Sequence, residues 1–177
     1  AASDVYKRQV DTLPDAFDLQ EIQFVFPKRL SDDYSEDGKT PADYWLGGTD
    51  PLLGVGIVGD RDQNEYPVIE YVEPGKESDK NRVWIPVDRE KTGDFKLLSD
   101  TAETINGEPA NVYSMDLTNY FDELGFYPKL VRINYRCCWV PLTTCLGNVR
   151  LVGVSRIAGQ RVNTINTNSV SYTHLTL

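Results

Sequence analysis

Residues 130–139 read LVRINYRCCW, with apolar and polar side chains in alternation. Successive side chains of a β-strand point to opposite faces of its sheet. We therefore expect Val131 and every second residue after it to face a core, and Arg132 and every second residue after it to face the other side. This period of two over the whole stretch predicts a half-buried strand, and it is the clearest local signal in the chain. The predicted core face consists of Val131, Ile133, Tyr135, Cys137 and Trp139.

Other short apolar stretches recur between turns, and the 177 residues include 13 glycines and 10 prolines. Residues 22–26 alternate in the same way and are followed by Pro27, which ends a strand. Residues 52–58 and 66–72 flank a polar loop and are expected to form a hairpin. Residues 148–157 are apolar on both faces, as an interior strand requires. The pattern predicts an all-β fold, an antiparallel β-sandwich of jelly-roll type.

One short helix is expected near residues 118–124. Thr118 can cap its start, because a hydroxyl oxygen accepts a hydrogen bond from a free backbone amide of the first turn. Gly125 can end it, because glycine readily adopts the left-handed conformation that follows many helices. The sequence therefore predicts this single helix within a fold built of strands.

The charge and composition exclude several classes of protein. The chain has 27 acidic and 18 basic residues and a formal net charge of −9, so nucleic acid is not an expected partner. No apolar run is long enough for a membrane span. The only histidine is His174, which leaves residues 10–168 without a Ser-His-Asp triad or an imidazole metal ligand. Paired carboxylates remain possible, but none stands out, and we predict no catalytic residue.

Both ends resemble translated sequencing adapter of the kind found on metagenomic reading frames. Residues 1–9 read AASDVYKRQ and residues 169–177 read SVSYTHLTL. We expect both ends to be non-native, so neither is used to predict the fold. Residues 10–168 are then expected to form a single β-sandwich domain, taken from a longer natural protein.

Three segments near the end of the chain carry a resemblance to a known family. They are VYSMDLTNYF at residues 112–121, LVRINY at 130–135 and NVRL at 148–151. Together they resemble the closing half of a galactose-binding-like β-sandwich, in which an Asp-Leu-Thr turn leads into a long strand and then a closing strand. The resemblance covers residues 110–158 and implies a carbohydrate-binding or accessory module. Because the loop residues that hold the ligand in that family have no counterparts here, none is transferred.

The candidate ligand site is centred on Trp84. If Val83, Ile85 and Val87 face the core, the period of two places Trp84 outward, beside Arg82. Sugars bind proteins by stacking their C–H faces on aromatic rings while polar side chains hold their hydroxyl groups. If the two strands are neighbours, the same sheet face is lined by Arg132, Asn134 and Arg136.

Alternatives to this site remain open. Tyr44 and Trp45, in the polar loop of residues 28–51, form a second candidate platform for a sugar. That loop could also cover Trp84, or the indole could stack on an arginine for stability alone.

A structural calcium ion is the one cofactor that the sequence suggests. Asp60, Asp62 and Asn64 place three oxygen donors at alternate positions of a loop, as calcium sites do. An EF-hand is excluded because Glu65 stands where that loop needs glycine and Tyr71 where it needs glutamate. The alternative is a hydrated loop tip without a metal.

The three cysteines allow one disulfide. Cys138 and Cys145 lie symmetrically about the pair Pro141-Leu142, so a bond across this turn is geometrically possible and would suit an oxidising compartment. Cys137, on the predicted core face, is expected to act as a small apolar group. Three reduced cysteines are the alternative, since an odd number gives no disulfide framework.

The sequence thus favours a non-catalytic carbohydrate-binding or accessory module of a larger extracellular or cell-envelope protein. A structural virion protein of a phage tail or capsid is the alternative, because jelly rolls also serve that role. A fragment of a carboxylate-dependent glycoside hydrolase is a second alternative. Fold alone does not separate these functions.

Overall fold

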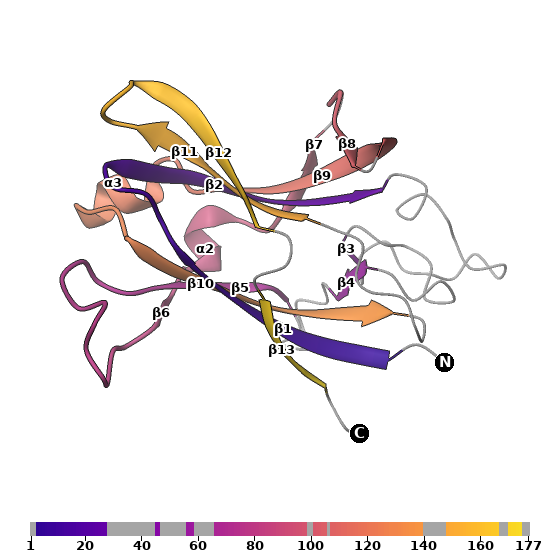
Figure 1. Cartoon of the computed structure of the whole chain (residues 1–177), viewed down its shortest axis with the longest axis horizontal. Helices are drawn as coiled ribbons and strands as arrows, with labels where there is room; N and C mark the ends of the chain where they lie inside the picture. The colour runs from indigo at the N-terminus through magenta and orange to yellow at the C-terminus, as the bar shows by residue number, and fades with distance from the viewer. Residues whose placement is uncertain are drawn as a thin grey trace, which may run out of the picture.

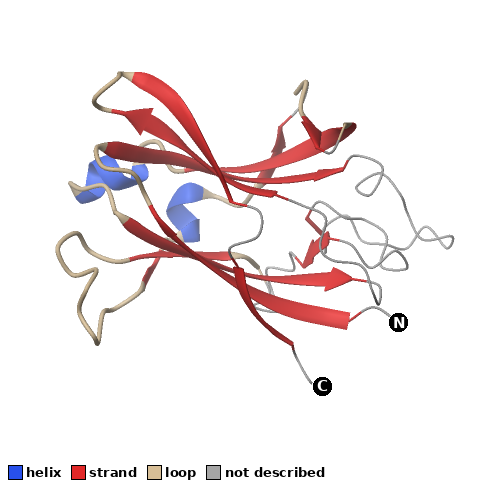
Figure 2. Cartoon of the chain, viewed as in Figure 1, coloured by secondary structure: helices blue, strands red, loops and turns tan. Residues whose placement is uncertain are grey.

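The described part of the chain folds into two antiparallel β-sheets that face each other, with two short helices beside them (Figures 1 and 2). The prediction of an all-β sandwich is therefore confirmed. The computed structural model describes residues 3–27, 45–46, 56–58, 66–98, 101–105, 107–139, 148–166 and 170–174. The helices are α2 (Arg89–Thr92) and α3 (Tyr120–Leu124).

The first sheet, which we call sheet A, is built around one long central strand. Its strands are β1 (Ser3–Thr12), β3 (Trp45–Leu46), β4 (Gly56–Val58), β5 (Val68–Tyr71), β6 (Ile85–Pro86), β10 (Leu130–Trp139) and β13 (Val170–His174). They run in the order β13-β1-β10-β4-β3, and β5 pairs with both β10 and β6.

The second sheet, sheet B, faces sheet A across the core (Figure 1). Its strands are β2 (Phe17–Pro27), β7 (Lys96–Leu98), β8 (Thr104–Ile105), β9 (Glu108–Asp116), β11 (Asn148–Ser155) and β12 (Gln160–Asn166). They run in the order β12-β11-β2-β9-β7, and β8 pairs with β9.

Strand β10 has the two faces that its sequence predicts. Val131 and Ile133 are fully buried and Tyr135 is buried, whereas Arg132 and Asn134 are half-buried on the outer face of sheet A. β1 pairs with the full length of β10 on one side, and β4 and β5 share its other side. The predicted strand over residues 130–139 is confirmed, and the predicted alternation of its faces is confirmed over residues 131–135.

The hairpin predicted for residues 52–58 and 66–72 is wrong. Strand β4 pairs with Cys137 and Cys138 of β10, and β5 pairs with residues 131–134 of the same strand. Both pairings are antiparallel, so β4 and β5 run in the same direction, one after the other. Because β10 is long enough to accept both, each apolar stretch takes β10 as its partner instead of the other stretch.

The core between the sheets is rich in aromatic rings. Phe24 of β2 lies with its ring centroid 4.9 Å from that of Phe95 and 5.3 Å from that of Tyr135. Phe121 of α3 is fully buried and meets the ring of Tyr71 edge-on at 5.5 Å. Edge-to-face contacts of this kind add to the free energy gained by burial. Helix α3 therefore closes one end of the core.

The predicted helix forms, but its start differs from the prediction. Its N-cap is Asn119, without a side-chain capping bond, and Thr118 instead donates its backbone amide to Asp116 at 2.8 Å. Hydrogen bonding from Thr118 is also the main reason why the pKa of Asp116 is lowered. Gly125 ends the helix in the left-handed region, as predicted, with φ 86° and its amide bonded to the carbonyl of Phe121.

The two ends predicted to be non-native occupy strands of sheet A, with β1 beside β10 and β13 beside β1. In β1 the polar Gln9 is fully buried and donates to Asp11 at 2.9 Å, whereas Val10 is 41% exposed. This strand therefore shows polar side chains to the core and an apolar one to the outside, the reverse of β10. The adapter origin of the ends stays a prediction.

The outer face of sheet B is partly covered by the segment that carries β8. Arg150 of β11 donates two hydrogen bonds to Glu103, at 2.7 and 3.1 Å. The Arg150 side chain is 8% exposed and that of Glu103 35%. The pair therefore fastens residues 101–105 to the sheet face, above a small apolar cluster of Val25, Ala110 and Val112.

We expect Glu103→Ala to lower the free energy of unfolding by about 2 kcal/mol at neutral pH, because it leaves the guanidinium of Arg150 buried without its carboxylate. The expected loss is smaller than the usual cost of breaking a buried ion pair, because solvent screens the charge of a carboxylate that is 35% exposed. Urea unfolding of the wild type and the variant measures the difference. Thr104→Ala, at the exposed neighbouring position, is the matched control.

The same pair gives a pH dependence. The pKa of Glu103 is lowered from 4.5, mainly by its hydrogen bond to Arg150. A lowered folded pKa means that the pair's contribution is complete above the unfolded value and is lost as the pH falls through the folded value. The difference between wild type and Glu103→Ala should therefore shrink when urea unfolding is repeated at about pH 3. An unchanged difference at that pH would show that the charge of Glu103 is not what matters.

Candidate functional site

Sheet A brings Trp84 to its outer face at the edge formed by β5 and β6. Glu70 of β5 pairs with Pro86 of β6 on one side and with Arg132 of β10 on the other. Paired residues of neighbouring strands share a face, so these three side chains lie on one side of the sheet. Trp84 precedes Pro86 by two residues and contacts Arg132 on this same side.

Arg132 connects the indole to a carboxylate. Its guanidinium carbon lies 4.3 Å from the centroid of the Trp84 ring. It donates to both carboxylate oxygens of Glu70, from Nη2 at 2.9 Å and from Nε at 3.3 Å. The two charged side chains are 16% and 14% exposed, so water screens the pair little. The guanidinium, the carboxylate and the indole therefore hold one another in a fixed arrangement.

Asn134 and Arg82 extend this arrangement on either side. The amide of Asn134 donates to the same Glu70 carboxylate, and its oxygen accepts from Arg8 Nε at 3.0 Å. Arg82 lies with its guanidinium carbon 5.5 Å from the Trp84 centroid. We call the five side chains that meet here the Trp84 cluster: Trp84, Arg82, Glu70, Arg132 and Asn134.

Four residues of the predicted site are therefore neighbours in the structure, namely Trp84, Arg82, Arg132 and Asn134. The fifth member, Glu70, was missed by the sequence analysis although it accepts hydrogen bonds from two of the others. A signal for it exists. Glu70 is the one charged residue among the apolar residues 66–72, which makes it the polar exception on a predicted strand.

The premise that placed Trp84 outward is wrong in part. Val83 was expected to face the core, but it is 69% exposed. Ile85 and Val87 do pack against the core, as half-buried side chains. The reason is that β6 covers only Ile85–Pro86, so the alternation of a strand does not reach back to Val83. Trp84 is itself half-buried, with Arg132 over its ring.

The other predicted site residues are placed less fully or not at all. Arg136 and Cys138 belong to β10 and Trp45 to β3, with their side chains outside the described part. The residues that lie outside the described ranges altogether are Tyr44, Asp60, Asp62, Asn64 and Cys145. The calcium loop and the disulfide therefore stay predictions. Among the described side chains, no group of three or more histidines, cysteines or carboxylates gathers where it could hold a metal.

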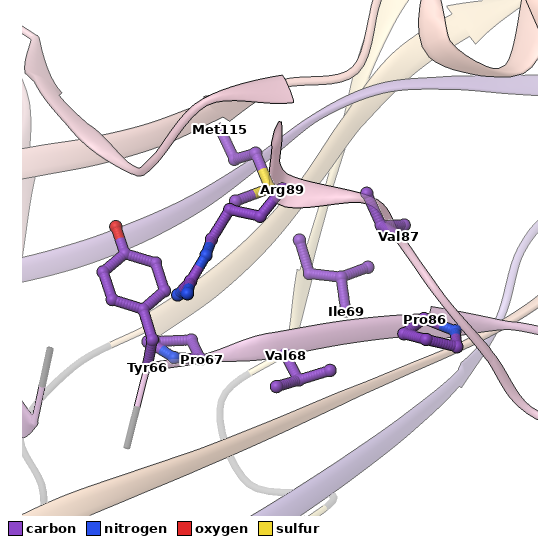
Figure 3. A pocket seen from close by; sticks show the side chains of 8 residues that line it. All are labelled: Tyr66, Pro67, Val68, Ile69, Pro86, Val87, Arg89 and Met115. Atoms are coloured by element: carbon purple, nitrogen blue, oxygen red, sulfur yellow. The ribbon is translucent and has the colours of Figure 1, made fainter. Parts of the chain in front are cut away.

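A cleft of about 280 Å³ opens at the edge of the sandwich between β5 and the start of α2 (Figure 3). Its apolar walls come from Val68, Ile69, Pro86, Val87 and Met115. Arg89 reaches across it toward Tyr66, with the guanidinium carbon 4.2 Å from the ring centroid. Arg89 also lies 3.6 Å from a carboxylate oxygen of Asp94. The cleft adjoins the Trp84 cluster, because Pro86 is the pairing partner of Glu70.

The geometry of the Trp84 cluster is the main basis for a function. No protein-family model, curated protein or solved structure matches this chain. Within the ranges that the structure describes, the helices are too short and too polar to cross a membrane. What the cluster can do chemically is to offer an aromatic ring, a carboxylate, an amide and two guanidinium groups on one face of a sheet.

Proposed function

We propose that this protein is a non-catalytic carbohydrate-binding module and that the Trp84 cluster is its ligand site. A sugar ring can lie with its C–H groups on the exposed part of the indole while neighbouring polar groups hold its hydroxyls. The observation that carries the proposal is the position of Glu70, which accepts from both Arg132 and Asn134 beside the ring. These polar groups are fixed before any ligand arrives, which reduces the entropy lost on binding.

We further propose that the module belongs to a larger extracellular or cell-envelope protein. This location is what the resemblance of residues 110–158 to galactose-binding-like sandwiches implies. The two antiparallel sheets support that resemblance at the level of architecture. Glu70 is assigned a holding role and not a catalytic one, because both of its oxygens are engaged by Arg132.

Affinity electrophoresis in gels that contain soluble polysaccharides tests the proposal. We expect Trp84→Ala to weaken binding at least about tenfold, or ~1.4 kcal/mol, because the stacking surface is lost. Val83→Ala is the matched control, since Val83 is adjacent, 69% exposed and outside the cluster, and this variant should migrate like the wild type. Equal retardation of Trp84→Ala and the wild type would show that the Trp84 cluster is not the ligand site.

A second variant separates binding from folding. Trp84→Phe keeps an aromatic face and should bind with an affinity between those of wild type and Trp84→Ala, while thermal unfolding verifies that all three are folded. If no polysaccharide retards the folded wild type, the proposed function is wrong. A stable trimer or larger assembly in sedimentation, together with that result, would favour the structural virion protein.

A further inference from the structure

We infer that the glycan bound at the Trp84 cluster carries negative charge, as carboxylate or sulfate groups, and that Arg82 recognises this charge. The inference rests on the proposed function and goes beyond it, because it names the class of sugar. Its basis is a difference between the two arginines of the cluster, Arg132 and Arg82, in the groups to which their guanidinium groups are hydrogen-bonded.

Arg132 has its charge matched inside the protein. It forms a two-pronged ion pair with Glu70, and both side chains are largely buried. Its donors at Nε and Nη2 are therefore occupied, and its role is to hold the indole and the carboxylate in place. A residue in this position is a positioning residue for the ligand site.

Arg82 has no such partner in the part of the chain that the structure describes. It is exposed, its guanidinium lies against the Trp84 ring, and its Nη1 donates one hydrogen bond to the backbone carbonyl of Glu77 at 3.2 Å. Among the described residues, no carboxylate lies within ion-pair distance of its guanidinium. The Nε and Nη2 donors of Arg82 thus remain for an external acceptor, and a guanidinium presents its donors as a fork that matches a carboxylate or sulfate.

The position of Arg82 suits a charged sugar. A uronic acid or a sulfated sugar carries its anionic group at the edge of the ring, so a sugar stacked on Trp84 would bring that group to the rim of the indole. Arg82 lies over this same indole, 5.5 Å from its centroid. Its guanidinium is paired with no carboxylate of the described ranges, so binding an anion there breaks no ion pair among those residues.

The charge of the whole molecule makes this local arrangement informative. The chain has a net charge of −9 and repels polyanions in general. Within the Trp84 cluster the balance is reversed, with Arg82 and Arg132 against the single carboxylate of Glu70. A nonspecific polyanion has little to gain elsewhere on such a surface, so the cluster selects anionic ligands that also present a sugar face.

The experiment compares three polymers in affinity electrophoresis, namely a polyuronate, a sulfated galactan and a neutral galactan. We expect the wild type to bind at least one anionic polymer about tenfold more tightly than the neutral one, and added salt to reduce this preference. Arg82→Gln should lose about tenfold in affinity for that anionic polymer and clearly less for the neutral one, so that its preference for the anionic polymer is lost. Retardation by the polyuronate alone or the sulfated galactan alone identifies the anion.

Arg89→Gln is the matched control. It removes the same charge and the same kind of contact with an aromatic ring, but Arg89 stacks on Tyr66 and is paired with Asp94. Equal losses in Arg82→Gln and Arg89→Gln would mean that net charge alone matters, which overturns the inference. Trp84-dependent binding that is equal for neutral and anionic polymers would also overturn it but leave the proposed function standing. If none of the three polymers binds, both fail.

Discussion

Phe24→Ala is expected to lower the free energy of unfolding by about 4 kcal/mol, a cost typical of truncating a fully buried aromatic ring. The ring is fully buried in the middle of sheet B and packs against Phe95 and Tyr135. Truncation removes both aromatic contacts and leaves a cavity that the two sheets are too tightly paired to close. A domain is typically stable by only about 5–15 kcal/mol, so the variant should be near the limit of folding.

Urea unfolding followed by tryptophan fluorescence measures this loss. Leu97→Ala is the control, because Leu97 lies in the same sheet but is 54% exposed, and its change should stay within about 0.5 kcal/mol. A loss below about 1 kcal/mol for Phe24→Ala would show that the sheets do not pack on this ring as the structure has it.

Gly153→Ala is expected to destabilise the protein by about 3 kcal/mol, at the upper end of what overpacking costs. Gly153 stands where the pairing of β11 with β2 shifts by one residue. A Cβ atom there would lie 2.2 Å from the backbone oxygen of Asp18 and 2.6 Å from Cζ of Phe17. The backbone oxygen cannot move away without breaking the strand pairing, so the methyl group forces β11 and β2 apart.

Gly75→Ala provides the comparison, because glycine is favoured there by the backbone conformation and not by a lack of space. Gly75 has a φ of +91° and open space around its Cα, so alanine there meets backbone strain of about 1 kcal/mol but no clash. The midpoint temperature of thermal unfolding should therefore be clearly lower for Gly153→Ala than for Gly75→Ala. The reverse order would mean that the irregularity in β11 opens freely to admit a side chain.

The alternation of side chains predicted individual strands well and their partners poorly. Residues 130–139 and 22–26 were recognised because burial of one face follows directly from a period of two. The pairing of both β4 and β5 with β10 was missed, since it depends on the length of a strand far away in the sequence. The shift at Gly153 was also missed, although a glycine inside a strand is a known sign of a bulge.

The candidate site likewise has residues that local alternation predicts and residues whose place depends on strand pairing. The alternation predicted that Trp84, Arg82, Arg132 and Asn134 share the outer face of one sheet, and in the structure they are neighbours there. The sequence marks Glu70 only as the polar exception of its strand, because its place beside Arg132 and Asn134 results from the pairing of β5 with β10. The bonding of the two arginines is likewise a tertiary property, and no local pattern distinguishes them.

Strand β10 has two different faces, with Ile133 in the interior and Asn134 on the outer face that carries the proposed ligand site. Substitutions at the outward positions of sheet A leave the interior contacts untouched, so ligand preference can change in small steps while the scaffold persists. Variation at Arg82 and Asn134 is then a practical starting point for a library of binders with altered selectivity. Natural relatives built on this scaffold would be expected to differ there first.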